Sequence, residues 1–110
     1  MISGPEAFDA LDMRVGRVTR AEPNAAARKP AYCLWIDFGP LGEKRSSAQL
    51  TVAYRAEELV GQLVVAAMNL GTRRIAGFES EVLVLGLPDA QGNVILLAPE
   101  RDVPLGGRVY

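Results

Sequence analysis

The sequence contains no histidine and a single cysteine, and these two shortages exclude several kinds of chemistry. Histidine is the commonest general base, the commonest metal ligand and the usual switch near neutral pH, so its absence removes all three roles together. Cys33 has no second cysteine, which excludes an internal disulfide and a cysteine metal cluster. We therefore expect a reducing, cytoplasmic setting.

Long apolar runs, phosphate loops and grouped carboxylates are also missing. The acidic N-terminus lacks the apolar core of a signal peptide, and the apolar window 59–70 is too short for a bilayer, so we expect no membrane insertion. Segment 39–47 lacks Walker spacing, and Ser46 and Ser47 have no histidine to activate them. The sequence therefore predicts a protein that is not an enzyme, with no catalytic residue, no metal and no cofactor.

The composition is that of one ordinary globular domain spanning residues 1–110. Hydrophobic residues make up 49% of the chain and charged residues 23%, which is typical of a globular domain. The net charge of -1 argues against a strongly basic nucleic-acid binder, although a local basic groove stays open.

Short alternating segments separated by turn signals predict an all-β fold. In residues 31–39, Tyr32, Leu34, Ile36 and Phe38 alternate with Cys33, Trp35 and Asp37. Gly16 interrupts another alternating segment and indicates a bulge or a close backbone approach. The expected strands are 13–22, 31–39, 44–52, 62–70 and 79–86, with a further extended segment at 93–99, and the expected helices are 5–11 and 53–61. Segment 102–109 is expected to be mostly loop with a terminal strand.

This order of elements matches a five-stranded OB-fold, a Greek-key barrel. The short N-terminal helix precedes the barrel, and the second helix lies between strands three and four. Barrels of this type bind ligands on the face of strands two and three, between the flanking loops.

Four sequence blocks resemble the tRNA-binding-domain family. They are "LDMRVGRV", "LWIDFG", "RSSAQLT" and "RRIAGFESEVLVLG", and they occur in the family's order over nearly the whole chain. Within that family the blocks most resemble those of its secretion chaperones. The resemblance implies a homodimeric OB-fold that binds unfolded or precursor polypeptides, or alternatively tRNA and other structured RNA. A scaffold that carries no ligand is the third possibility.

The candidate binding groove combines an arginine rim, apolar contacts and polar strand residues. Arg73 and Arg74 form the rim or are solvated loop charges, and Arg14, Arg17 and Arg45 either join them or scatter over the surface. Trp35 falls on the face opposite Leu34, whereas Phe78 fits either the core or a ligand contact. The full candidate set is Arg14, Arg17, Leu34, Trp35, Arg45, Ser46, Ser47, Gln49, Arg73, Arg74, Ile75, Phe78, Ser80 and Glu81.

Glu81 is the residue that separates the two ligand hypotheses. RNA-binding relatives tend to have glutamine at this place, and a carboxylate repels phosphate, so the prediction favours polypeptide over tRNA. In the expected homodimer, the N-terminal helix and the C-terminal segment form the interface.

Overall fold

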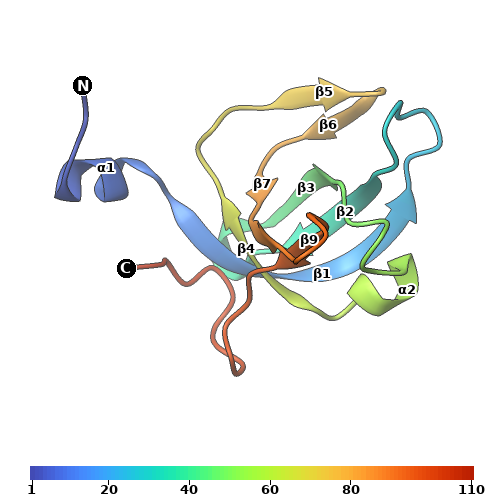
Figure 1. Cartoon of the computed structure of the whole chain (residues 1–110). Helices are drawn as coiled ribbons and strands as arrows, with labels where there is room; N and C mark the ends of the chain where they lie inside the picture. The colour runs from blue at the N-terminus through green and yellow to red at the C-terminus, as the bar shows by residue number, and fades with distance from the viewer.

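A computed structural model describes all residues, 1–110, and its main feature is a curved five-stranded antiparallel sheet that forms a nearly closed barrel (Figure 1). The sheet has the order β3-β2-β1-β4-β7. Its strands are β1 (Met13–Pro23), β2 (Tyr32–Asp37), β3 (Glu43–Ala48), β4 (Leu63–Ala67) and β7 (Leu83–Val84). This architecture confirms the predicted all-β, OB-like fold.

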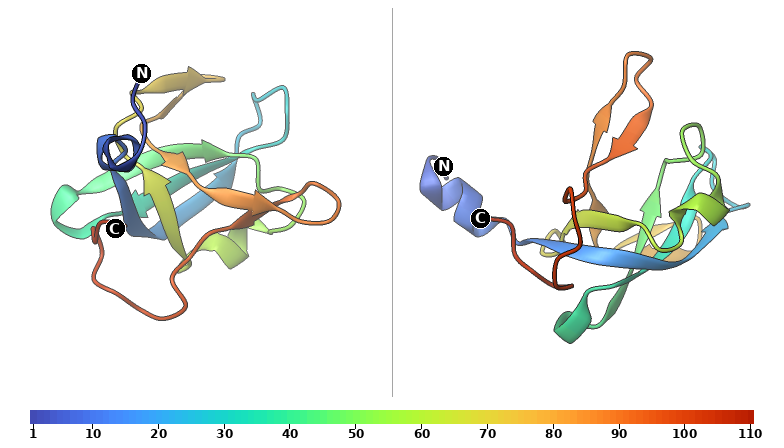
Figure 2. Two further views of the ribbon diagram at one scale, coloured as in Figure 1. Left: turned by 60° about the vertical axis from the view of Figure 1, so that its left-hand side comes forward. Right: turned by 90° about the horizontal axis from the view of Figure 1, so that it is seen from below.

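The remaining elements lie outside the five-stranded sheet. They are the helices α1 (Pro5–Ala10) and α2 (Ala56–Leu59), the 3-10 turn η1 (Gly39–Leu41), and two hairpins, β5 (Arg73–Ile75) with β6 (Phe78–Ser80) and β8 (Gly86–Pro88) with β9 (Val94–Leu96). Both hairpins project from the barrel, in different directions, and α1 stands away from the body (Figure 2). No helix is long and apolar enough to cross a membrane.

The core follows the alternation of β2. Leu34, Ile36 and Phe38 are completely buried, and they join Val18 from β1 and Val64 from β4 in one apolar cluster. Residues of the opposite phase, including Trp35, stay outside this cluster. The period of two read from the sequence therefore identifies the inner face correctly.

Gly16 provides the predicted close approach. A Cβ atom at this position would lie 2.6 Å from Cγ2 of Ile36 and 2.7 Å from Cε1 of Phe38, which leaves no room for a side chain. The bulge itself lies further along β1, where the register shifts between Val18 and Arg20. As a result, Arg20 is placed opposite Trp35.

The predicted fifth strand, 79–86, is wrong as a single element. The backbone N–H groups of Glu81 and Val82 donate to the carbonyl of Arg45 on β3, whereas Leu83 pairs with Ala67 on β4. The chain changes its partner strand within this segment, so it breaks into β6, β7 and β8. Only Val82 of the apolar run 82–85 is buried, and Leu83 is 50% exposed.

Several other predicted elements are shorter than expected. The strand predicted at 62–70 spans only Leu63–Ala67, and only Val94–Leu96 of segment 93–99 is a strand. The third strand ends at Ala48 rather than at residue 52, because the N–H of Leu50 turns back to the carbonyl of Ala48 and the Leu50 side chain enters the core. The helix predicted at 53–61 contains only Ala56–Leu59. The terminal strand is reduced to an isolated bridge between Arg14 and Arg108.

Candidate functional site

Hairpin β5–β6 lies beside the outer edge of β3 and is formed by a two-residue turn. Ala76 and Gly77 occupy this turn with φ angles of 50° and 82°. Two successive positive φ values match the twist of a tight hairpin, and glycine tolerates this conformation without strain. The turn thus explains the "AG" pair between the arginines and Phe78.

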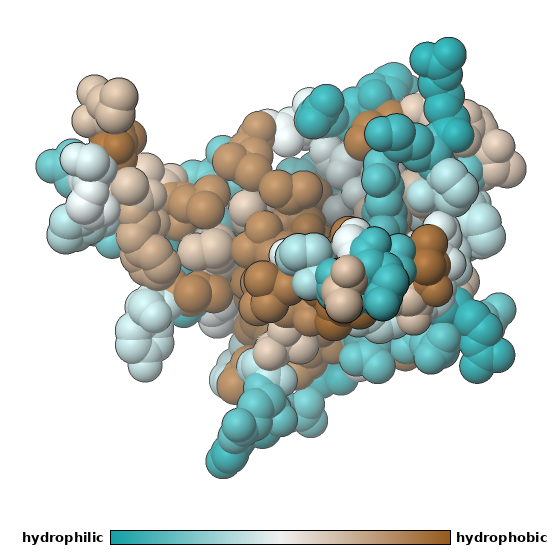
Figure 3. Space-filling model, viewed as in Figure 1, coloured by the Kyte–Doolittle hydropathy of each residue, from teal (hydrophilic) through white to brown (hydrophobic).

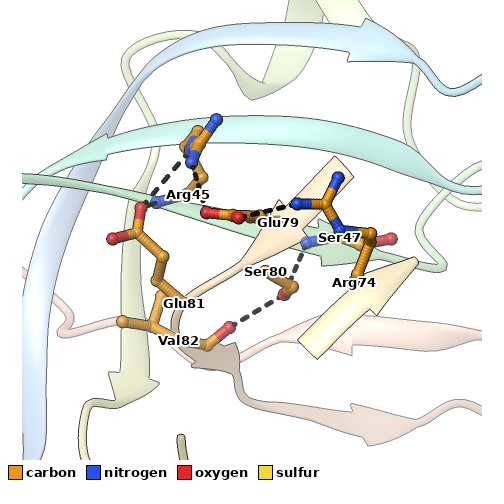
Figure 4. A network of polar contacts seen from close by, with 7 residues as sticks. All are labelled: Arg45, Ser47, Arg74, Glu79, Ser80, Glu81 and Val82. Atoms are coloured by element: carbon orange, nitrogen blue, oxygen red, sulfur yellow. Dashed lines mark hydrogen bonds and ion pairs between the residues drawn. The ribbon is translucent and has the colours of Figure 1, made fainter. Parts of the chain in front are cut away.

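A polar network fastens this hairpin to β3 (Figure 4). The N–H of Ser47 donates to Oγ of Ser80 at 3.0 Å, and the N–H of Arg45 donates to Oε1 of Glu81 at 3.1 Å. The guanidinium of Arg45 contacts both Glu81 and Glu79, at 3.4 and 3.2 Å. Glu79 also pairs with Arg74 at 2.9 Å. Glu81 is therefore a partner of Arg45 and not an isolated negative charge.

An aromatic contact fastens the same hairpin to β2. The rings of Trp35 and Phe78 meet edge to face, with centroids 5.4 Å apart. Arg20 lies over the Trp35 ring at 4.3 Å, and Arg45 lies over Phe78 at 5.6 Å. Such cation–π contacts reinforce the aromatic pair. Both aromatic side chains therefore anchor the hairpin, and Arg20, which the sequence analysis missed, takes part because of the bulge in β1.

The loop between β1 and β2 approaches the hairpin from the other side. Its backbone is closed by a bond from the N–H of Asn24 to the carbonyl of Ala31. The Asn24 side-chain amide donates to the carbonyl of Ile75 at 3.3 Å, which connects the loop to β5. The end of β3 therefore lies between two projecting segments.

Three adjoining hollows run across the end of β3, and we call them together the trough. The middle hollow, about 500 Å³, lies between the β1–β2 loop and the hairpin turn. It shares Lys29 and Gln49 with a hollow of about 310 Å³ that extends to the β8–β9 turn. It shares Ser47 and Ile75 with a hollow of about 220 Å³ beside the β4–β5 connection.

Positive charge in the trough comes from one expected residue, Arg73, and from two that the sequence analysis missed, Arg28 and Lys29. Arg28 and Lys29 line the middle hollow and Arg73 lines the third, and none of the three has an ion pair or a side-chain hydrogen bond within the chain. No carboxylate lines any of the three hollows. The trough is therefore a positive surface on a protein whose net charge is -1.

The structure does not bring Arg14 and Arg17 to this surface. Arg14 pairs with Asp12 at 2.7 Å and donates to the carbonyl of Gly106. Arg17 donates to the carbonyl of Gly61 and lies 3.6 Å from Asp102. Both arginines instead tie β1 to neighbouring segments away from the hairpin.

The fourteen candidate residues thus separate into groups. Ser47, Gln49, Arg73, Ile75 and Ser80 line the trough, while Trp35, Arg45, Arg74, Phe78 and Glu81 fasten the hairpin. Leu34 and Ser46 have no exposed surface, which corrects their assignment as contact residues. The sequence analysis missed Arg28 and Lys29. They are adjacent basic residues in the proline-bounded loop "PNAAARKP", and this pairing is the sequence feature that could have pointed to them.

The only thiol lies close to this surface. Cys33 pairs with Ser47 on β3 and with Glu22 on β1, and its side chain is buried. Burial raises the pKa of the Cys33 thiol, and the charge of Glu22 raises it further. The thiol is therefore less reactive than an exposed cysteine.

The barrel with its flanking loop and projecting hairpin has the architecture of an OB-type domain. The family model for the tRNA binding domain matches residues 13–108, so the chain belongs to the tRNA-binding-domain family. This confirms the resemblance seen in the sequence blocks.

Solved structures and curated proteins of this family are similar over most of the chain. The chaperone CsaA from Bacillus anthracis is 47% identical with a TM-score of 0.87, and all of both chains is covered. The CsaA chaperone protein from Picrophilus torridus is 39% identical with a TM-score of 0.90, covering 99% of this chain and 100% of that one.

Methionine–tRNA ligase from Methanothrix thermoacetophila is 41% identical over 100 residues, which is 90% of this chain and 14% of the ligase. The chain therefore spans only a small part of such ligases, and the similarity does not extend to the rest of those enzymes.

Proposed function

We propose that the protein is an ATP-independent chaperone that binds unfolded or precursor polypeptides in the trough. The observation that supports this proposal most is the composition of the middle hollow. Ala26, Ala27, Ala31, Ile75 and Ala76 give it small apolar walls, and Ser47 and Gln49 add hydrogen-bonding groups. Shallow apolar surface with few directional contacts suits variable, extended segments, which bind weakly because ordering them costs entropy.

The two CsaA relatives support the same proposal, since their similarity covers 99% to 100% of this chain. The sequence has no glycine-rich phosphate loop, so the proposal includes binding and release without nucleotide hydrolysis. The lone buried thiol is compatible with the predicted reducing, cytoplasmic setting.

A homodimer is part of this proposal. Apolar side chains gather on the face over β7 and β9 (Figure 3), where Leu83, Leu87, Ile95 and Leu97 are 38% to 59% exposed. Helix α1 has no buried residue within one chain. A second copy that covered this face and α1 would remove apolar surface from water. Light scattering should give twice the mass of one chain, and a monomer at micromolar concentration would contradict this part.

Suppression of aggregation tests the proposed activity. A chemically denatured client protein is diluted into buffer, and its light scattering is followed with and without an excess of this protein. We expect suppression that Gln49→Trp reduces, because this side chain would fill the junction of two hollows. The matched control is Gln62→Trp, since Gln62 is also exposed but lines no hollow. Unchanged scattering at excess protein would contradict the proposal.

Binding of tRNA is the second candidate function, and two observations favour it. Arg28, Lys29 and Arg73 are unpaired cations, and phosphate contacts dominate RNA affinity. In addition, the ion pair with Arg45 offsets the charge of Glu81, so the predicted repulsion of phosphate loses much of its basis. If RNA is the ligand, retention of tRNA should fall steeply as salt rises, and a flat salt dependence would exclude this candidate.

A further inference from the structure

The trough combines apolar walls with positive charge and lacks negative charge. Three of the four cations without an ion pair, Arg28, Lys29 and Arg73, line it, and the fourth, Lys44, does not. The other basic residues have carboxylate partners, as Arg45 and Arg74 do with Glu79. The unpaired positive charges of the protein are therefore concentrated in the trough, where a ligand can reach them.

The three cations are spread along the trough rather than clustered at one end. Lys29 borders both the first and the middle hollow, Arg28 borders the middle one, and Arg73 borders the third. An extended chain lying across the end of β3 would pass all three. The charged side chains of that bound polypeptide would then affect its affinity, because carboxylates attract the three cations and ammonium groups are repelled by them.

The walls of the trough favour polypeptide over nucleic acid as the anionic ligand. Proteins that bind single-stranded nucleic acid stack bases on exposed aromatic side chains. No aromatic residue lines any of the three hollows, and Trp35 and Phe78 are engaged with each other. Alanine, isoleucine and valine side chains line the hollows instead, and these suit aliphatic side chains of a client.

We propose that the trough selects extended polypeptide segments in which apolar residues are interspersed with aspartate or glutamate, and that it discriminates against lysine-rich segments of equal apolar content. The carboxylates would contact Arg28, Lys29 and Arg73, and the apolar side chains would lie against Ala27, Ile75 and Val94. This preference rests on the proposed polypeptide binding and specifies which clients that binding would favour.

Three matched peptides test the preference. Each has about a dozen residues and the same leucines, and the charged positions hold glutamate in one, lysine in the second and glutamine in the third. Fluorescence anisotropy of labelled peptide gives the dissociation constants. We expect the glutamate peptide to bind about ten-fold tighter than the lysine peptide at about 50 mM salt, since each exposed pair contributes a few-fold at most. At about 200 mM salt the difference should shrink.

Charge-reversal variants show whether the trough causes the preference. Arg28→Glu combined with Lys29→Glu should weaken binding of the glutamate peptide and strengthen binding of the lysine peptide. Loss of folding could not cause the second change, because it would only lower affinity. Lys44→Glu should leave the preference intact, since this free cation lies outside the trough.

Equal affinity for the glutamate and lysine peptides would overturn the inference, while the proposed polypeptide binding would stand. Absence of binding for all three peptides, together with no suppression of client aggregation, would overturn both. Bulk tRNA that binds more tightly than the glutamate peptide and displaces it would also overturn the inference and assign the positive trough to RNA.

Discussion

The barrel body and hairpin β5–β6 differ in what holds each of them in place. In the body, five paired strands surround completely buried side chains such as Leu34, Ile36 and Phe38. The hairpin has three residues in each strand and only one buried residue, Ser80. One aromatic contact, the Arg45–Glu79–Glu81 network and two hydrogen bonds, Ser47 to Ser80 and Asn24 to Ile75, attach it to the body.

Because of this difference, we expect the barrel body to determine the stability of the fold and the hairpin to affect the proposed ligand binding. Burial of apolar surface is the main stabilising contribution to a domain, so the body should determine whether the chain folds. The hairpin supplies Arg73, Ile75 and Ser80 to the trough, and weakly attached segments of this kind open at a lower free energy than the core does. Substitutions in the two regions should therefore change different observables.

The largest effect is expected in the body. Leu34→Ala leaves a cavity at a completely buried position, and we expect the free energy of unfolding to fall by about 2–5 kcal/mol. Urea denaturation measures this change. Leu41→Ala is the matched control, because Leu41 is 42% exposed and its truncation should cost less than about 1 kcal/mol. Equal losses in the two variants would refute the assignment of Leu34 to the core.

A smaller, local effect is expected from Phe78→Ala. Loss of the contact with Trp35 should lower the free energy of unfolding by about 1–2 kcal/mol and detach the hairpin before the body unfolds. Trp35 is the only tryptophan, so its fluorescence should shift to longer wavelength as water reaches the ring. An unchanged emission spectrum would show that the hairpin does not depend on this contact.

Cys33 offers a second probe of the same variant. Burial and the charge of Glu22 raise the pKa of its thiol, so the folded protein should react slowly with thiol reagents at neutral pH. If opening of the hairpin uncovers the outer face of β2, Phe78→Ala should speed the reaction. If the variant and the unsubstituted protein react at the same rate, residues outside the hairpin shield the Cys33 thiol.

The ionic part of the attachment should contribute less. Glu81→Gln keeps the size of the side chain but removes the charge that Arg45 contacts, and we expect a loss of about 0.5–1 kcal/mol. Hydrogen exchange at the Arg45 amide should become faster, because this N–H donates to the Glu81 carboxylate. Glu57→Gln is the control, since Glu57 has no ion pair; a similar effect there would contradict the proposed role of Glu81.

Substitution of the adjacent residues Arg73 and Arg74 should change stability least, and the two variants should differ clearly in peptide binding. Arg73 is unpaired and lines the trough, whereas Arg74 pairs with Glu79. Arg73→Gln should leave the free energy of unfolding within about 0.5 kcal/mol but weaken binding of the glutamate peptide a few-fold. Arg74→Gln should leave binding nearly unchanged. Anisotropy titrations of both variants compare them directly, and a larger loss for Arg74→Gln would reverse the assignment.

The sequence predicts the body better than the hairpin for a physical reason. Alternation in β2 reports burial within one strand, so Leu34, Ile36 and Phe38 are identified as inward residues from their spacing alone. The change of partner strand within segment 79–86 depends on contacts with Arg45, a residue far away in the chain, and no local pattern encodes it.

The site could be predicted only in part for a similar reason. Ser47, Arg73 and Ile75 were identified because they lie in blocks that resemble the family, and they do line the trough. Whether an arginine has an ion pair depends on which carboxylate the fold brings beside it. Arg45 is paired with Glu81 in this way, whereas Arg73 has no such partner. The bulge in β1, which aligns Arg20 with Trp35, likewise follows from register and not from composition.

The central claim is that ligand binds across the end of β3, and amide chemical-shift mapping tests it most directly. The ¹⁵N-labelled protein is titrated with the glutamate peptide under conditions where the barrel is fully folded. We predict shifts concentrated at residues 26–31, Ser47, Gln49 and 73–76, with little change near Arg14 and Arg17. Shifts confined to the apolar face of β7 to β9, or to the Arg14 and Arg17 side of β1, would contradict the account.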